Sequence, residues 1–225
     1  MNQLFEQLGP LAYPLLLCSV VAATLIIERT IYFLGLPRLK KEAFNVLTRT
    51  ILQKDWESVQ ESLGQIPQPF RDALGRFLAA RNEPAELREE MARLWLISQH
   101  KRLVRGIPLL TLLAIVSPLF GLLGTVLGMI EAFQAVSVHT GPVHPALLAD
   151  GLWEAMLTTA TGLFIAIPAL TVAHLLRMWA RVYLERCEFE FNRISLAVQG
   201  IDAFGLSAPV GSYVSGYRQL HGAEA

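Results

Sequence analysis

The stretch GLWEAMLTTATGLFIAIPALTVAHLLR, residues Gly151 to Arg177, decides the fold of this chain. From Ala155 to Leu176 it carries no Asp, Glu, Lys or Arg. At about 1.5 Å per residue this run is about 33 Å long, enough to cross the roughly 30 Å hydrocarbon core of a bilayer. Glu154 lies beside it, although a charged side chain within a membrane helix costs about 2.5 to 3.5 kcal/mol on insertion scales. The sequence therefore predicts a membrane helix with a polar side.

The polar and the small residues of this helix are predicted to lie on different sides. Thr158 and Thr161 follow Glu154 at helical spacing and share its face, whereas Thr159 lies about 140° from Glu154 at about 100° per residue. Five residues are small enough for a neighbouring backbone to approach closely: Gly151, Ala155, Gly162, Ala166 and Ala169. We interpret the polar side as the lining of a pore and the small side as a helix contact. An alternative is that Glu154 caps the helix start while the threonines donate to carbonyls of their own helix.

The composition indicates an integral membrane protein. The chain has 225 residues, of which 53% are hydrophobic and only 17% are charged, and its mean hydropathy is +0.42. A net charge of zero gives no indication of a nucleic-acid partner. Cys18 lies in the first apolar run and Cys187 beyond the last one, so we expect no disulfide between them.

Two further apolar runs predict two further membrane helices. The first, at 11–36, includes Glu28 and Arg29, and we expect these charges to pair or to reach the membrane surface. The second lies at 106–137. Its glycines recur at helical spacing and include a GxxxG step, and together with one glycine of the third helix they predict close helix packing: Gly121, Gly124, Gly128 and Gly162.

The segment between the first two membrane helices, residues 37–105, has the pattern of amphipathic helices. Phe44, Leu47 and Ile51 recur with a period near 3.6, and a helix start is predicted at Asn82, which is followed by Pro84. Nothing obvious stops this last helix, so we expect it to continue without a break into the second membrane helix.

The distribution of positive charge predicts the orientation of the chain. All 19 Lys and Arg residues lie between Arg29 and Arg105 or between Arg177 and Arg218. Positive residues stay on the cytoplasmic side, so we expect an all-α protein with three transmembrane helices and long helices that extend into the cytoplasm. The predicted order is an outside N-terminus (1–10), a membrane helix (11–36), a cytoplasmic helical domain (37–105), a membrane helix (106–137), an outside loop (138–150), a membrane helix (151–177), and a cytoplasmic extension with a mobile tail (178–225).

Two motifs in the second and third membrane helices resemble those of a known family. GLLGTVLGMIEAF (Gly121 to Phe133) and GLWEAMLTTATGLFIAIPAL (Gly151 to Leu170) are similar to the paired signatures of the ExbB/TolQ family, of which MotA of the flagellar motor is a more distant relative. The order of three membrane helices, with the large loop between the first two, agrees with that family. The resemblance extends from about Leu11 to Gln199.

The resemblance implies a proton channel and stator subunit of a motor in the bacterial inner membrane, with a periplasmic N-terminus and a cytoplasmic C-terminus. Such subunits form a homo-oligomer, usually a pentamer, within the membrane lipids and surround the helices of an ExbD-like or TolR-like partner with one membrane span. That partner's membrane aspartate carries the proton. The motor drives a TonB-like protein for import of iron chelates, or a TolA-like protein for envelope maintenance. The sequence GTVLGMIEAF and the compact tail lead us to favour ExbB over TolQ.

The same resemblance assigns residues to the proton path. Glu154, Thr159 and Thr125 match the family's path residues, and Thr158 joins them because it shares the polar side of Glu154. Trp153 stands where a small residue is common in the family, and Thr158 and Thr161 stand where the family is often small or apolar. We therefore expect a polar side that is wider than usual.

Two other classes of function are weaker interpretations. A non-conducting membrane scaffold would assemble and still function with Glu154 replaced by alanine. An intramembrane enzyme would need a nucleophile with its base or a metal cluster, and the predicted membrane helices contain neither a Ser/His pair nor an HExxH motif. His139 and His144 lie five residues apart without a further ligand nearby, so we expect no metal site and no cofactor.

Overall fold

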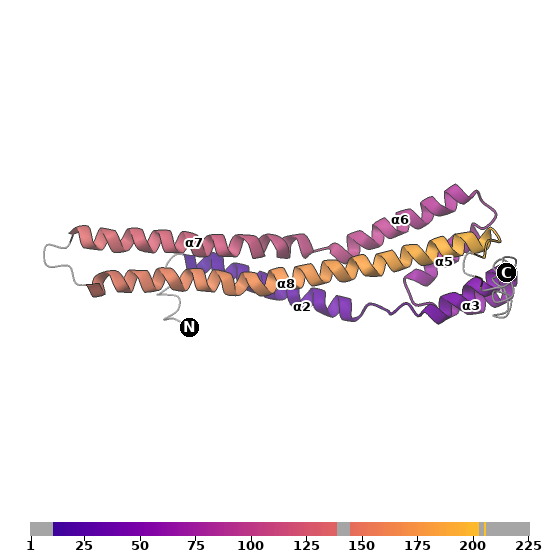
Figure 1. Ribbon diagram of the computed structural model, residues 1–225, viewed down its shortest axis with the longest axis horizontal. Helices are drawn as coiled ribbons and strands as arrows, with labels where there is room; N and C mark the ends of the chain where they lie inside the picture. The colour runs from indigo at the N-terminus through magenta and orange to yellow at the C-terminus, as the bar shows by residue number, and fades with distance from the viewer. Residues whose placement is uncertain (1–10, 139–144, 203–204, 206–225) are drawn as a thin grey trace, which may run out of the picture. The chain divides into compact units, whose positions relative to one another are not determined.

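The computed structural model describes residues 11–138, 145–202 and 205, and these residues fold into helices with no strand among them. Figure 1 shows the helices in chain order: α2 (Ala12–Leu34), α3 (Lys41–Leu52), α4 (Trp56–Gly64), α5 (Phe70–Ala79), α6 (Ala85–Val104), α7 (Ile107–Val138) and α8 (Pro145–Val198). By length and composition, α2, α7 and α8 each include a stretch that can cross a membrane. The predicted all-α fold with three membrane helices is confirmed.

The chain divides into two compact units. Unit 1 is formed by the described parts of Met1–Gly35 and Val104–Ala180, and it contains α2, α7 and the first part of α8. Unit 2 is formed by the described parts of Leu36–Leu103 and Arg181–Ala225, and it contains α3 to α6 and the last part of α8. The helix α8 therefore supplies residues to both units.

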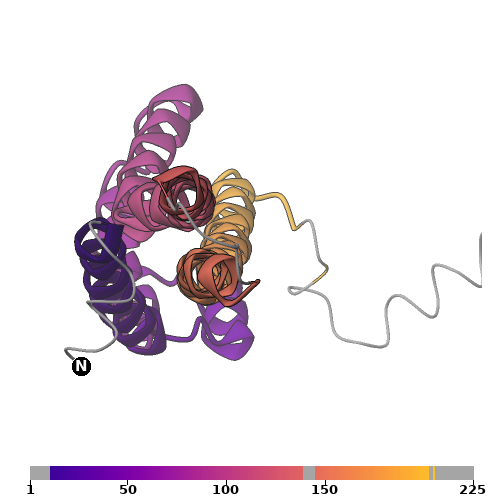
Figure 2. The ribbon, with the colours of Figure 1, turned by 90° about the vertical axis from the view of Figure 1, so that its left-hand side faces the viewer.

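In unit 1 many large apolar side chains face outwards, although some such as Ile107 and Leu110 are buried, and small residues fill much of the interior. Phe164 is 81% exposed and Leu17 is 66% exposed, whereas Ala155, Ala169 and Ala173 are buried. Figure 2 shows the three helices end-on, with α7 next to both α2 and α8. Membrane helices pack in this way because lipid tails solvate the large apolar side chains, while small residues let helices approach closely.

The expected continuous helix into the second membrane span is wrong. Helix α6 ends at Val104 and α7 begins at Ile107, with Gly106 between them at a φ of +81°. Glycine suits this left-handed conformation because it has no Cβ, and a Cβ there would lie 3.3 Å from Nε of Arg29. A glycine just after one helix and a proline, Pro108, in the first turn of the next were the signals for this break.

The predicted C-terminal boundary of the loop at 138–150 is also wrong. Helix α7 extends to Val138, and α8 begins at Pro145, six residues before the predicted start at Gly151. Proline is favoured in the first turn of a helix because its missing N–H has no partner there in any case. His139, His144 and most of the predicted mobile tail lie outside the described residues.

Unit 2 has a core like that of a water-soluble protein. The predicted stripe on α3 is buried, with Phe44, Leu47 and Ile51 each at most 2% exposed. Around Phe191 of α8 lie three aromatic rings from α5 and α6, with centroids 4.8 Å (Phe70), 5.6 Å (Phe77) and 5.5 Å (Trp95) away. Offset and edge-to-face ring contacts of this kind stabilise a core beyond the burial of their area.

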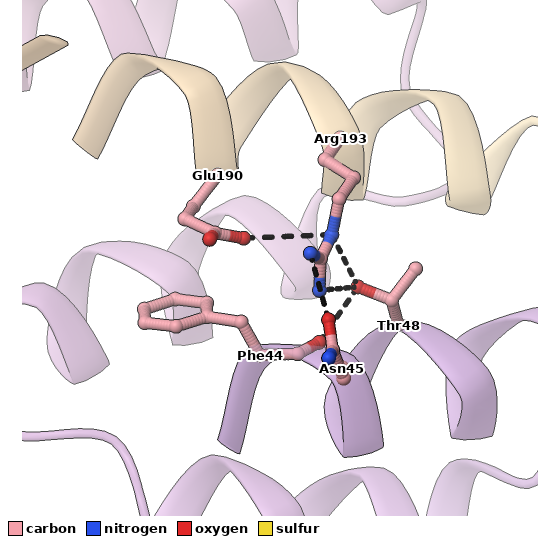
Figure 3. A network of polar contacts seen from close by, with 5 residues as sticks. All are labelled: Phe44, Asn45, Thr48, Glu190 and Arg193. Atoms are coloured by element: carbon pink, nitrogen blue, oxygen red, sulfur yellow. Dashed lines mark hydrogen bonds and ion pairs between the residues drawn. The ribbon is translucent and has the colours of Figure 1, made fainter. Parts of the chain in front are cut away.

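A buried polar network joins α3 to α8 within unit 2 (Figure 3). Arg193 donates to Oδ1 of Asn45 at 3.0 Å and, through Nε and Nη2, to Oγ1 of Thr48 at 3.1 Å and 2.9 Å. Oε2 of Glu190 lies 3.4 Å from Nε of Arg193, and both side chains are buried. Burial raises the pKa of Glu190 and lowers the pKa of Arg193, because each charged form loses solvation by water.

Candidate functional site

The helices α7 and α8 meet along a line of small residues, which we call the α7–α8 seam. Its members are Ser117, Gly121, Gly124 and Gly128 of α7, and Gly151, Ala155, Thr158 and Gly162 of α8. A Cβ on Gly162 would lie 2.6 Å from the carbonyl oxygen of Ser117, and a Cβ on Gly121 would lie 2.8 Å from Cα of Thr159. These glycines are therefore required by the close approach of the two backbones.

Two hydroxyl groups of α8 converge on one carbonyl of α7. Thr159 donates to the carbonyl oxygen of Gly121 at 2.9 Å. Thr158 donates to the carbonyl oxygen of Ala155 at 2.7 Å, and its Oγ1 lies 3.3 Å from the same Gly121 oxygen. The sequence identified Gly121 only as a packing residue, because a backbone acceptor on another helix leaves no signal in the sequence.

The predicted separation between a polar side and a small side of α8 requires a correction at Thr158. Its side chain is 4% exposed and lies in the seam against Gly124, whereas Glu154 is exposed. Thr158 lies only about 40° around the helix from Glu154, so the sequence places the two residues on the same side. In the structure the edge of the seam falls within that angle, with Thr158 inside the contact and Glu154 outside it. A threonine fits among small residues because backbone carbonyls satisfy its hydroxyl group.

Glu154 lies on α8 next to the seam. Its neighbour Ala155 is buried, and a Cβ on Gly128 would lie 2.8 Å from Cβ of Ala155. No hydrogen bond or ion pair joins the Glu154 carboxylate to another described residue. Because α8 begins at Pro145, Glu154 is more than two turns inside the helix, and the alternative of an N-terminal cap no longer applies.

The other threonines also donate their hydroxyl protons to backbone carbonyls. Thr125 donates to Leu122 at 2.7 Å and Thr161 donates to Leu157 at 2.8 Å, each within its own helix. Both side chains are half-buried. With their protons engaged, these hydroxyl oxygens retain lone pairs, so they can accept a hydrogen bond from water.

A second charged side chain of unit 1, Arg29, lies beside Gly106. Arg29 is buried, pairs with Glu28 at 2.9 Å and lies over the ring of Tyr32 at 5.7 Å from its centroid. The predicted pairing of Glu28 with Arg29 is confirmed. This pairing neutralises a buried charge beside the start of α7. Among the described residues, no group of three or more His, Cys, Asp or Glu side chains is arranged to hold a metal ion.

Comparison with known proteins defines the class of this chain. Residues 47–188 match the MotA/TolQ/ExbB proton channel family. The chain is 39% identical over 208 residues to the biopolymer transport protein exbB1 of Vibrio cholerae, covering 89% of this chain and 90% of that protein. It is 38% identical over 96 residues to the Tol-Pal system protein TolQ of Haemophilus influenzae, covering 43% of this chain and 34% of that protein.

This chain is a member of the MotA/TolQ/ExbB proton channel family, as its two motifs indicated. Solved structures agree on the fold. The MotAB structure of C. jejuni superimposes with a TM-score of 0.66 at 15% identity, covering 87% of this chain and 76% of that one. The flagellar MotAB stator complex of Bacillus subtilis gives 0.61 at 16% identity, covering 90% and 79%.

Proposed function

We propose that this chain is the proton-conducting stator subunit of an inner-membrane motor that drives a TonB-like protein for import of iron chelates. The observation that carries this choice is the extent of similarity. The match to the Vibrio cholerae biopolymer transport protein covers 89% of the chain, whereas the TolQ match covers 43%. A TolQ-like role with a TolA-like protein is the second candidate, since TolQ belongs to the matched family.

The proposed proton path follows the exposed flank of the α7–α8 seam. Glu154 supplies the carboxylate, and Thr159 and Thr125 supply hydroxyl oxygens that accept hydrogen bonds from water. A carboxylate in a membrane helix is costly unless it faces protein or a water-filled path, and the membrane potential supplies about 2.3 kcal/mol per charge per 100 mV. These residues carry protons through water and no catalytic chemistry is proposed for them.

The outward apolar side chains of unit 1 support a homo-oligomer, which we propose to be a pentamer. Two large apolar residues of α8 are strongly exposed: Trp153, the residue before Glu154, at 62%, and Phe164 at 81%. In the proposed assembly, lipids and neighbouring copies cover these side chains, and an ExbD-like protein places its membrane helix beside Glu154. The proposed orientation puts the N-terminus in the periplasm and unit 2 in the cytoplasm, following the distribution of Lys and Arg.

A complementation experiment tests this function. A strain that lacks the gene is complemented with wild type or Glu154→Gln and grown on chelated iron and, separately, on detergent. We expect Glu154→Gln to fail on chelated iron while accumulating normally, because glutamine keeps the shape of the side chain and cannot exchange a proton.

The matched control is Glu131→Gln, which removes an exposed carboxylate of α7 one residue before Ala132. Ala132 lies against Gly151, so the two carboxylates are at similar depth along the seam. Failure on detergent alone would transfer the chain to the TolQ-like role. Full growth of Glu154→Gln on both media, where the deletion strain fails, would favour the non-conducting scaffold.

A further inference from the structure

The side chain of Thr158 occupies a notch between two glycines of α7. A Cβ on Gly124 would overlap Oγ1, Cβ and Cγ2 of Thr158, and a Cβ on Gly121 would lie 3.0 Å from the Thr158 carbonyl oxygen. Thr158 is only 4% exposed. The Thr158 side chain therefore fills the space over Gly124, while the backbone of Thr158 and Thr159 lies against Gly121; we call this place the Gly121–Gly124 notch.

The hydroxyl group of Thr158 lies near a backbone carbonyl of each helix. It donates to the Ala155 carbonyl at 2.7 Å in its own helix, and its Oγ1 lies 3.3 Å from the Gly121 oxygen that also accepts the Thr159 hydroxyl at 2.9 Å. A valine of the same shape would remove the donor to the Ala155 oxygen and would place a methyl group against the Gly121 oxygen. The contact is therefore polar as well as steric.

The position of Thr158 controls the direction in which Glu154 points. The two residues are four apart on α8, so any rotation of the helix at Thr158 moves Glu154 by the same angle. Ala155, which follows Glu154, is buried against Gly128, and a rotation of about 100° could carry Glu154 to the angular position that Ala155 now holds. A fixed rotation of α8 is thus required to keep the carboxylate outside the seam.

We infer that Thr158 is a positioning residue for proton conduction: its hydroxyl, seated in the Gly121–Gly124 notch, fixes the rotation of α8 that presents Glu154 and Thr159 to the path. This inference rests on the proposed function. It gives Thr158 a role through Glu154 and Thr159, since its own buried oxygen is out of reach of water in the path.

Proton influx measures this role directly. The deletion strain is complemented from the native locus with the full-length chain, and a pH-sensitive fluorescent protein in the cytoplasm reports influx after an external acid pulse. Thr158→Val and Thr158→Ala remove the hydroxyl, and Thr158→Ser keeps it. Thr171→Val is the matched control, because the Thr171 hydroxyl is exposed and donates only to Ile167 of its own helix, at 2.8 Å. Glu154→Gln reports the function itself.

We expect Thr158→Val and Thr158→Ala to lower influx by about three- to twentyfold, the range found for polar contacts between membrane helices, because both variants remove the contact of Oγ1 with the Gly121 oxygen at 3.3 Å. Thr158→Ser and Thr171→Val should keep wild-type influx, with equal amounts of assembled complex in all strains. If Thr158→Val does not accumulate, Thr158→Ala decides, since alanine is smaller and favours helix.

Three outcomes would overturn the inference while leaving the function in place. Influx could fall with Glu154→Gln but not with either hydroxyl-free variant. Thr158→Ser could fall as far as Thr158→Val, so that the hydroxyl is not what matters. The amount of assembled complex could fall in parallel with influx, which would make the role structural only. Equal influx in wild type and Glu154→Gln would instead reject the proposed function.

Discussion

The helices of the two units pack through different kinds of residue. In unit 1 the seam between α7 and α8 consists of glycine, alanine and hydroxyl residues, and large side chains such as Phe164 face outwards. In unit 2 the interior consists of large rings around Phe191, with the Arg193 and Glu190 pair among the buried residues. One helix, α8, takes part in both arrangements.

The difference is the one expected if lipid surrounds unit 1 and water surrounds unit 2. In water, burial of large apolar side chains stabilises the fold by roughly 25 cal/mol per Å², so unit 2 puts them inside. Lipid tails remove that driving force, so close backbone approach and hydrogen bonds between helices take its place in unit 1. A substitution that alters bulk should therefore have opposite effects in the two units.

The largest effect is expected in unit 2 from Arg193→Met. Loss of the guanidinium leaves Glu190 buried without its ion-pair partner and leaves Asn45 and Thr48 without a donor. We expect a loss of about 3 to 5 kcal/mol in the free energy of unfolding, as for other broken buried pairs. Hydrogen exchange of the full-length protein in detergent, read from peptides of α3, measures it.

The matched control is the double variant Arg193→Met with Glu190→Leu. Removing both charges should restore most of the protection, because a well-packed apolar pair is often as stable as a buried ion pair. A single variant that exchanges as slowly as wild type would show that the network of Figure 3 does not hold α3 to α8.

A second, smaller effect compares one glycine of each unit. Gly162→Ala places a Cβ 2.6 Å from the backbone oxygen of Ser117, so α7 and α8 must separate, at about 1 to 3 kcal/mol. Gly75→Ala in α5 meets only Cδ2 of Leu63 at 3.6 Å, an ordinary contact. For Gly75→Ala we expect a gain of about 0.5 to 1 kcal/mol in the free energy of unfolding, because alanine restricts the unfolded chain.

Hydrogen exchange in α7 and α5 measures the two changes. If both variants lost stability, or both gained it, the contrast between the units would be contradicted.

The smallest effect is the pH dependence of Glu190→Gln. Burial raises the pKa of Glu190 above its ordinary value. The folded state then holds the proton more tightly than the unfolded state, so this contribution to stability is complete below the ordinary pKa and is lost as the pH rises through the raised pKa. Glutamine cannot ionise, so the variant should gain stability relative to wild type as the pH rises through that interval.

Unfolding of wild type and Glu190→Gln across acidic to neutral pH measures this gain. Glu185→Gln on the same helix is the control, because Glu185 is exposed, and its curve should run parallel to that of wild type. A Glu190→Gln curve that also runs parallel, or that diverges in the opposite direction, would contradict the prediction.

How much of the site could be predicted from the sequence depended on the range of the interactions involved. Glu154, Thr159 and Thr125 were identified from motifs within single helices, and their roles in the path remain predictions. The seam glycines were also identified, because their spacing is a local pattern. The burial of Thr158 was not predicted. Thr158 and Glu154 are only about 40° apart around the helix, and this spacing does not show where the contact with α7 begins.

The sequence by itself determined the class of this protein. Uncharged runs, helical periods and the placement of Lys and Arg are properties of contiguous residues, and they were enough to predict three membrane helices. The resemblance of two motifs, which are also contiguous, indicated the family. Only the tertiary structure decided that the helix is interrupted at Gly106, that α8 begins at Pro145, and that the hydroxyl groups of Thr158 and Thr159 both lie at the Gly121 carbonyl. It also paired Arg193 with Asn45 across 148 positions. These features depend on which backbone lies opposite, and residues far apart in sequence carry no local mark of meeting.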